Sequence, residues 1–486
     1  MTRALTVFHA LGLLLIMFSM AYVMPVITAV IYGNSEMLLD FLLAMGWTAA
    51  AGMLMWLLTR RYKGELSIRH GYLLVVTMWT AMPAFATIPL LMLIPGLSFT
   101  DAYFETMSAM TTTGATALTG LDTLPPSIQV WRHEMEWLGG LGIIVLAVAV
   151  LPLLGIGGRQ LFKAETPGPM KDSKLTPRIA DTARNLWAVY VALTLMCVFA
   201  LKWAGMDWLD AVCHAFSTTG LGGFSTHDES IGFFNSPLIE FVMIVFMLVA
   251  TVNFATHFLA WNSKTLSVYK YDAEAKAAVG LILASCLGIA FFLWWNEVYL
   301  DFLTALRHAA FNVVSIGASS GFASVDFGQW PIFAPLWMMF VGCIAASSGS
   351  TGGGIKMVRT LVLFKQGGRE LLRLLHPAAV NPMKIGGRVV PNNIVFSVLG
   401  FIFLYFITIA TLLFILLISG MDFLTALSAV LACVNNFGPG LGLVGPGSNY
   451  QVLTDFQTWV CTFGMLVGRL EIFTVLILFT PYFWRR

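Results

Sequence analysis

Four short segments of this chain repeat one pattern, in which an acid-headed apolar stretch ends in a glycine turn that leads into another long apolar run. Two of the stretches before the turns are identical, because DFLTAL occurs at 301–306 and again at 422–427. The turns read TTTGA at 111–115, GLGGF at 220–224, ASSGF at 318–322 and NNFGP at 435–439. They recur roughly every hundred residues, a period far longer than that of a solenoid. A chain with four copies of one element is able to arrange them around a common axis.

The composition places these repeats in a membrane. Of the 486 residues, 58% are hydrophobic and only 11% are charged, which is too apolar for a soluble protein. Runs of about 18 apolar residues or more are long enough to cross the hydrocarbon layer. The sequence holds ten such runs, at 5–31, 37–58, 71–94, 137–154, 185–204, 237–261, 278–296, 332–348, 394–419 and 457–482. We therefore expect an all-α polytopic membrane protein with about ten transmembrane helices.

The turns divide the chain into a leader and four units. The first two apolar runs have no glycine turn between them, whereas each later pair encloses one. The apolar stretches before the turns have roughly 9–12 residues, too few to span, so we expect re-entrant pore helices around one pore; amphipathic helices on the outer surface are the alternative. The expected division is a two-helix leader at 1–65 and helix–pore helix–helix repeats at 66–160, 161–265, 266–375 and 376–486.

The charges predict an orientation. When the ten helices are followed in order, most of the 27 Lys and Arg fall on the side of the N-terminus, and most of the 25 Asp and Glu fall opposite. The positive-inside rule then places both termini in the cytoplasm. Acidic residues contribute little to topology, so their excess outside predicts a mouth that attracts cations. Simple solubilisation of the outer loops is the alternative explanation.

The turns suit a monovalent cation. Irregular backbone at membrane depth is tolerated only where it is buried in protein or lines water. Rings of backbone carbonyls replace the hydration shell of such an ion, and no carboxylate lies in any of the turns. No set of acid, base and nucleophile lies at membrane depth, so we expect no enzyme. The cysteines are scattered and predict no metal site, although the relevance of Cys213 and Cys433, near two turns, stays open.

Two features below the turns suggest a gate. The sequence AASSGSTGGGIK at 345–356 is too rich in glycine for a stable lipid-facing helix, so it is expected to line the pore. A glycine-rich helix end at the inner surface, next to Lys356, is the alternative. Arg469 is expected near the middle of the last helix, where a charge costs about 3 kcal/mol or more. Our hypothesis is that Arg469 faces the ion path, bonds the loop carbonyls and repels cations; a buried structural ion pair is the alternative.

Several motifs together resemble the Trk/Ktr/HKT superfamily of potassium transporters, and within it the TrkH-type uptake subunits. These motifs are TTTGAT, GGFSTHD, SSGSTGGGIK, NNFGPGLG and GRLEIFT, and the resemblance covers essentially the whole chain. It implies four potassium-channel-like units, each with a filter glycine and two preceding residues whose carbonyls bind the ion. In this sequence these residues are Thr112, Thr113 and Gly114; Leu221, Gly222 and Gly223; Ser319, Ser320 and Gly321; and Asn436, Phe437 and Gly438. In the second unit, Gly220 is an alternative turn glycine.

The resemblance also implies a function, a gate and partners. It implies potassium uptake across the bacterial inner membrane, with the potassium ion as ligand and no organic cofactor. The segment 345–354 becomes an intramembrane gating loop, so the expected gating residues are Gly349, Gly352, Gly353, Gly354 and Arg469. The implied assembly is a homodimer in membrane lipid that docks a cytoplasmic nucleotide-binding ring of the TrkA type on its basic inner face; no nucleic acid is involved. An ion-coupled symporter, driven by protons or sodium, stays an alternative.

Overall fold

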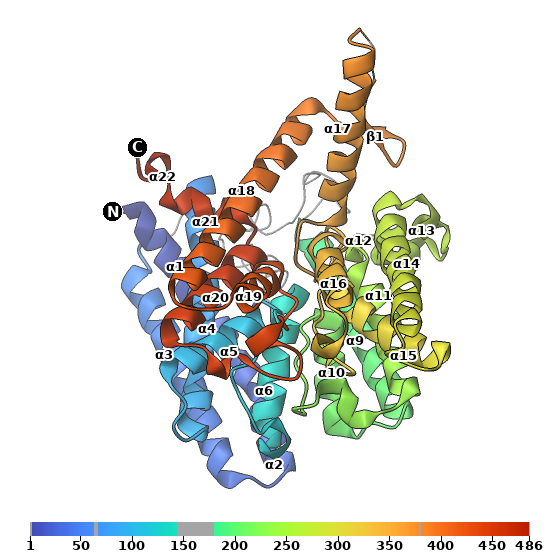
Figure 1. Cartoon of the computed structure of the whole chain (residues 1–486). Helices are drawn as coiled ribbons and strands as arrows, with labels where there is room; N and C mark the ends of the chain where they lie inside the picture. The colour runs from blue at the N-terminus through green and yellow to red at the C-terminus, as the bar shows by residue number, and fades with distance from the viewer. Residues whose placement is uncertain (1, 63–66, 143–178, 379–380, 486) are drawn as a thin grey trace.

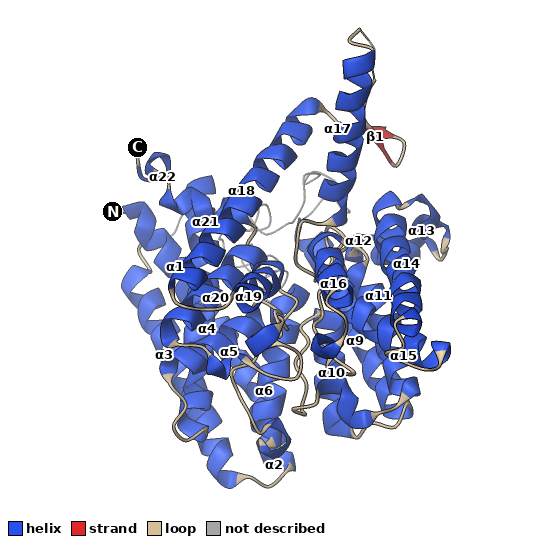
Figure 2. Cartoon of the chain, viewed as in Figure 1, coloured by secondary structure: helices blue, strands red, loops and turns tan. Residues whose placement is uncertain are grey.

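The computed structural model describes residues 2–62, 67–142, 179–378 and 381–485, and its regular structure is almost entirely helical (Figure 1). Figure 2 shows one small hairpin among these residues, formed by β1 (Lys384–Ile385) and β2 (Arg388–Val389). The expected all-α polytopic class is therefore confirmed. The fourth expected span and the linker that follows it lie mainly outside the described residues.

The leader is a helical pair that packs against the first unit. It consists of α1 (Thr2–Phe18), η1 (Ser19–Tyr22), α2 (Val23–Ile31) and α3 (Ser35–Thr59). The buried Tyr22 donates a hydrogen bond of 2.9 Å to the carbonyl of Phe85, and its ring stacks on Trp131 with centroids 4.3 Å apart. The leader therefore packs against both long helices of the first unit, through Phe85 and Trp131.

Four units then repeat the order of a long helix, a short helix and a second helix. The elements are α4 (Ile68–Leu93), α5 (Phe99–Met110), α6 (Pro126–Trp137) and the π-helical η3 (Leu138–Gly142); α9 (Ile179–Trp203), α10 (Trp208–Gly220), α11 (Pro237–Thr251) and α12 (Phe254–Ser263); α14 (Ala273–Trp295), α15 (Phe302–Gly317), α16 (Phe333–Ile344) and α17 (Met357–Leu375); and α18 (Asn392–Ile418), α19 (Phe423–Asn435), α20 (Asp455–Arg469) and α21 (Ile472–Leu476). Short connecting elements are η2 (Leu121–Thr123), η5 (Ser230–Phe234), α13 (Ser267–Tyr271), η6 (Phe327–Gln329), η7 (Gly442–Val444), η8 (Tyr450–Val452), η9 (Ile477–Phe479) and α22 (Pro481–Trp484).

The short helices before the turns lie in the interior. Every residue of α5 from Ala102 to Met110 is buried, and α10, α15 and α19 are buried over most of their length. Side chains cap their N-termini, since Asp207, Asp301 and Asp422 each accept a hydrogen bond from the backbone N–H three residues later. These helices are therefore not amphipathic surface helices.

Several of the expected spans are not continuous helices. Among the described residues, six helices are long and apolar enough to cross a membrane, or up to eight if each bent pair is one span. The pair α11–α12 bends by 94° and the pair α20–α21 by 112°, while α16 ends after 12 residues. At the first bend, Asn253 caps α12 by accepting the Ala255 N–H at 2.8 Å. Hydropathy alone detects no such break, because apolar residues continue on both sides.

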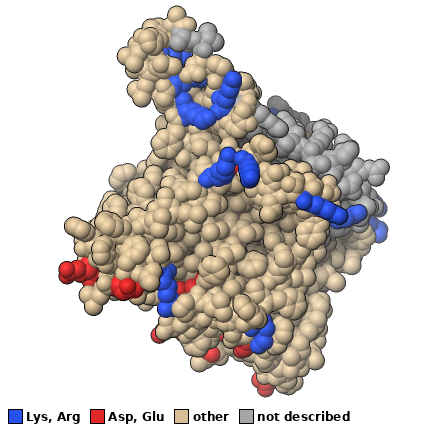
Figure 3. Space-filling model, turned by 90° about the vertical axis from the view of Figure 1, so that its right-hand side faces the viewer, with Lys and Arg blue, Asp and Glu red and all other residues tan. Residues whose placement is uncertain are grey.

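Charges separate along the long direction of the molecule. On the face shown in Figure 3, Lys and Arg predominate in the upper part, including the projecting arm of α17, whereas most Asp and Glu lie along the lower edge, where some Lys or Arg also occur. The arm stays helical through Gly367 and Gly368 to Leu375, where α17 ends. On this face, basic residues therefore dominate one end and acidic residues the other.

Candidate functional site

The four turns share one backbone conformation. The residue two places before each turn glycine has a positive φ between 52° and 62°, and the glycine itself has a φ between 80° and 97°. In each turn, the N–H of the residue before the glycine donates to a carbonyl of its own short helix at 2.8–3.1 Å. These pairs are Thr113–Ser108, Gly222–Ser217, Ser320–Ser315 and Phe437–Ala432. Counted in this way, Gly223 and not Gly220 is the equivalent glycine of the second unit.

The turns meet in a closed ring. At each turn glycine, an added Cβ would overlap or crowd the carbonyl oxygen of the residue before the glycine in the next unit. The distances would be 2.1 Å from Gly114 to Gly222, 2.1 Å from Gly223 to Ser320, 2.6 Å from Gly321 to Phe437 and 2.8 Å from Gly438 to Thr113. The series returns to the first unit, and all the turn glycines line one cavity of about 80 Å³. The ring therefore has room for glycine only, and it surrounds one small space.

The geometry favours positive charge at the ring. The short helices α5, α10, α15 and α19 all end at the turns, so their C-terminal carbonyls direct partial negative charge toward the same centre. The turn carbonyls add oxygen atoms of the chemical type that is able to replace water around an alkali cation. No group of three or more His, Cys, Asp or Glu with metal-binding geometry occurs in the described residues, and all six cysteines are buried thiols.

In each unit, one side chain of the short helix also forms a hydrogen bond with the segment that follows the turn glycine. We call these side chains, Glu105, His214, Asn312 and Ser428, the brace residues. Glu105 accepts the N–H of Ala117 at 2.9 Å, and Asn312 accepts that of Ser324 at 3.2 Å. In the second unit His214 bonds the hydroxyl of Ser225 at 2.9 Å, and in the fourth unit Ser428 accepts the N–H of Leu441 at 2.8 Å. The sequence analysis missed this set, although its members stand at nearly equal distances before the turn glycines.

The buried carboxylates of Glu105 and Glu136 make further contacts that the sequence analysis did not predict. Glu105 pairs with Arg132 at 2.7 Å, and both side chains are 1% exposed. Glu136 accepts the N–H of Phe224 at 3.1 Å and the hydroxyl of Ser217. An added Cβ on Gly222 would lie 2.3 Å from the carboxyl carbon of Glu136, so the second turn requires glycine there too. Glu105 and Glu136 thus hold the backbone that follows the first and second turn glycines.

The irregular segment between α16 and α17, which we call loop 345–356, lies beneath the turns. An added Cβ on Gly353 would lie 2.1 Å from the carbonyl of Asn435, and one on Gly352 would lie 3.0 Å from the carbonyl of Ala318. The hydroxyl of Thr351 donates to the carbonyl of Thr219 at 3.2 Å. The loop therefore contacts the ends of three short helices, α10, α15 and α19, and it is not a helix end at the surface.

Other contacts tie the two ends of loop 345–356. One carboxylate oxygen of Glu274 accepts the N–H of Ser348 at 2.6 Å and the N–H of Val358 at 3.1 Å. The buried Lys356 donates to the carbonyl of Gly352 at 2.6 Å, so this lysine does not mark a solvated boundary. Gly354 has a φ of 88°, which favours glycine. Glu274 was missed in the sequence because it lies far from the loop along the chain.

On the other side, the loop contacts the bend of the second unit. The carbonyl of Gly349 accepts the N–H of Phe254 at 3.1 Å, and the N–H of Ser347 donates to the carbonyl of Thr251 at 3.3 Å. An added Cβ on Gly349 would lie 2.7 Å from the side-chain oxygen of Asn253. The bend between α11 and α12 therefore shares hydrogen bonds with the loop.

Arg469 lies at the end of α20, where the helix breaks, and not near the middle of a continuous helix as expected. Its guanidinium donates to the carbonyl of Thr351 at 2.8 Å and to the hydroxyl of Thr112 at 3.1 Å. It also donates to the carbonyl of Gly140 at 2.5 Å and to that of Gly139. The neighbouring Glu471 pairs with Arg359 at 2.7 Å. Arg469 thus joins loop 345–356, the first turn and η3.

Comparison with known proteins places this site in context. The model of the TrkH family, described as cation transport proteins, matches residues 39–485. The chain is 43% identical to the Trk system potassium uptake protein TrkH of Salmonella typhimurium and 44% identical to that of Halomonas elongata, with 99% of each chain covered. It also resembles the crystal structure of the potassium transporter TrkH from Vibrio parahaemolyticus, with a TM-score of 0.89, 41% identity and 99% of both chains covered.

Proposed function

Since the chain belongs to the TrkH family of cation transport proteins, which are transporters and not enzymes, we propose that it takes up potassium across the bacterial inner membrane. The closed ring of turns is the observation that carries this proposal. It supplies several carbonyl oxygens around one small cavity, and that arrangement suits a dehydrated monovalent cation.

In this proposal, the four turns form the selectivity filter. The filter residues are Thr112, Thr113 and Gly114; Leu221, Gly222 and Gly223; Ser319, Ser320 and Gly321; and Asn436, Phe437 and Gly438. The filter is a single short ring, so it has fewer coordination sites than a long filter. We therefore expect potassium to be preferred over sodium less strictly than in a filter with several successive rings.

Loop 345–356 and Arg469 form the gate. The loop lies beneath the filter, and Gly349, Gly352, Gly353 and Gly354 let its backbone approach the neighbouring helix ends. Arg469 ties the loop to the first turn and adds a positive charge below the ring. Conduction then requires the loop to move, and an ion that passes Arg469 meets electrostatic repulsion.

The end of the molecule where basic residues predominate faces the cytoplasm, and both termini, which lie toward that end in Figure 1, are cytoplasmic. The acidic end then raises the local cation concentration outside. A membrane potential that is negative inside favours inward movement of potassium by about 2.3 kcal/mol per charge per 100 mV. The basic face, with the arm of α17, is a surface on which a cytoplasmic nucleotide-binding ring of the TrkA type would dock, and the transporter works as a homodimer.

Ion flux into liposomes that contain the purified protein tests the proposal. The expected order of uptake is potassium and rubidium above sodium, driven by voltage alone. If uptake instead requires and follows an imposed proton or sodium gradient, the protein is an ion-coupled symporter. If no alkali cation crosses under any gradient, the filter assignment is wrong.

A further inference from the structure

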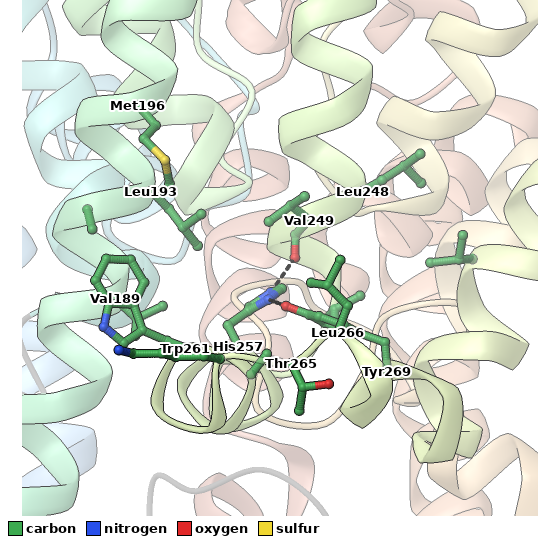
Figure 4. A pocket seen from close by; sticks show the side chains of 15 residues that line it. Val189, Leu193, Met196, Leu248, Val249, His257, Trp261, Thr265, Leu266 and Tyr269 are labelled. Carbon is green, nitrogen blue, oxygen red and sulfur yellow. Dashed lines mark hydrogen bonds between the residues drawn. The ribbon is translucent and has the colours of Figure 1, made fainter.

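A large apolar cavity opens at the bend of the second unit. It has a volume of ≈ 730 Å³ and lies between α9, α11, α12, α13 and α14. Figure 4 shows Leu193 and Met196 of α9 on one side, Leu248 of α11 opposite, and His257 of α12 at the bend. The cavity exists because α12 turns away from α11 by 94°, which leaves the space that a straight helix would fill.

The rim of the cavity has the chemistry of a membrane interface. Trp261 is 69% exposed and Leu266 is 78% exposed, while Tyr269 donates to or accepts from His257 at 2.8 Å. Aromatic side chains of this kind gather where hydrocarbon meets headgroups. Lys264 lines the rim and has no carboxylate partner among the residues that the structure describes. The cavity thus combines an apolar interior with one uncompensated positive charge at its edge.

We propose that this cavity binds an anionic phospholipid, with an acyl chain between α9 and α11 and the headgroup phosphate at Lys264. The volume is in the range of roughly 300–1,000 Å³ that holds ligands of this size. The lysine selects an anionic headgroup over a neutral one, and anionic lipids are attracted to basic groups at the cytoplasmic leaflet. The bend, the apolar lining and the charge each point to this ligand without reference to ion binding.

The bound lipid would also act on the gate, and this part rests on the proposed function. Val249 and Val252 line the cavity. Thr251 lies between them in the chain, and its carbonyl accepts the N–H of Ser347 from loop 345–356 at 3.3 Å. The side chain of His257 bonds the carbonyl of Val249 at 2.9 Å and so fixes the bend. A lipid that fills the bend therefore biases the position of the segment that contacts the loop.

Binding is tested first, without any measurement of transport. Purified protein is taken from mixed vesicles of phosphatidylcholine and phosphatidylglycerol, and the lipids that stay bound are counted by native mass spectrometry. We expect Lys264→Gln to weaken phosphatidylglycerol binding by about fivefold, the loss expected for one basic residue near an anionic surface. Ala192→Phe, which fills the apolar part, should displace the lipid. Lys276→Gln is the matched control, because Lys276 is exposed on α14 but does not line the cavity.

Equal phosphatidylglycerol binding by the wild type, Lys264→Gln and Ala192→Phe overturns the proposal. So does tight binding of phosphatidylcholine in place of the anionic lipid, or a second copy of the chain seated on this face. Potassium flux is then compared in vesicles with and without phosphatidylglycerol. We expect wild type and Lys276→Gln to gain flux with the anionic lipid, and Lys264→Gln to lose that gain. A lipid that binds without changing flux overturns the link to the gate, whereas wild type that conducts in neither vesicle overturns the proposed function and leaves the binding result standing.

Discussion

Arg469 and Thr351 are joined by a hydrogen bond of 2.8 Å, from the guanidinium to the backbone carbonyl, directly beneath the first turn. This bond links the break in the last unit to loop 345–356, two parts of the chain that are far apart in sequence. Both the position of the loop and the charge below the ring therefore depend on one side chain.

Replacing Arg469 with Ala should speed potassium flux. The change frees the loop and removes a positive charge from the ion path. At an effective dielectric constant of about 20, a unit charge roughly 10 Å from an ion changes its energy by about 1.7 kcal/mol, so an increase on the order of tenfold is expected. Flux into liposomes measures it. Arg373→Ala is the control, because Arg373 pairs with Glu370 at an exposed site, where both side chains are 51% exposed. Unchanged flux together with loss of folded protein would instead favour a purely structural role.

Gly223→Ala and Gly220→Ala should differ in effect. Gly223 has a φ of 92°, and an added Cβ would lie 2.1 Å from the Ser320 carbonyl, so this variant should lose most uptake. The left-handed conformation alone costs a residue with a side chain about 1–2 kcal/mol. At Gly220, an added Cβ would lie 3.0 Å from the carbonyl of Glu136, and the helical backbone accepts alanine. Rubidium uptake by both variants checks the prediction, and a more severe loss in Gly220→Ala would contradict it.

Asn312→Leu tests the brace residues. The substitution keeps the side-chain volume but leaves the N–H and hydroxyl of Ser324 without this partner. An unsatisfied buried polar group costs about 1–3 kcal/mol, which we expect as lower stability and as a weaker preference for potassium over sodium. The ratio of the two fluxes is the readout. Asn296→Leu, at the exposed end of α14, serves as the control and should leave the ratio unchanged.

His227 should make the contact between the first two units depend on external pH. Its ring bonds Asp122 at 2.5 Å and Asp210 at 3.4 Å, and Asp228 accepts the N–H of Leu121 beside it. Partial burial alone would lower the pKa of His227, but the hydrogen bonds to Asp210 and Asp122 outweigh it and raise the pKa. Burial alone would raise the pKa of Asp122, but the hydrogen bond to His227 outweighs burial and lowers the pKa.

The sign of the effect follows from these shifts. The contribution of His227 is fully present below the pKa of a free histidine and is lost as pH rises through the raised value, whereas that of Asp122 is lost as pH falls through its lowered value. The melting temperature of the wild type should therefore exceed that of His227→Gln at mildly acidic pH, with the difference shrinking toward alkaline pH. A difference that stays constant across this range would show that the histidine does not titrate there.

The turns were predictable from the sequence because the signal is local. A glycine-containing turn after a short apolar stretch already identified the segments that the structure brings into one ring. The register of the second turn needed the structure, since Gly220 and Gly223 both fit the local pattern. The positive φ of Leu221 and Gly223, the hydrogen bond from Gly222 to Ser217 and the contact of Gly223 with the Ser320 carbonyl distinguish them.

The breaks and the buried carboxylates were not predictable in the same way. Hydropathy treats 237–261 as one apolar run, and only Asn253, a capping residue within it, hints at the bend. Glu274 bonds loop 345–356 although it lies far away in the sequence. The carboxylate of Glu136, in the first unit, occupies the space that a side chain at Gly222 of the second unit would need. Such pairs depend on tertiary contacts that a single sequence does not contain.

A ring built from quasi-equivalent turns of one polypeptide has a genetic consequence. In an assembly of identical subunits, every coding change appears at each corner of the axis simultaneously, so intermediate designs are inaccessible. Here each corner is encoded separately, and the neighbours Gly222, Ser320, Phe437 and Thr113 already differ. Ion preference is therefore able to change one corner at a time, while the other three preserve the geometry.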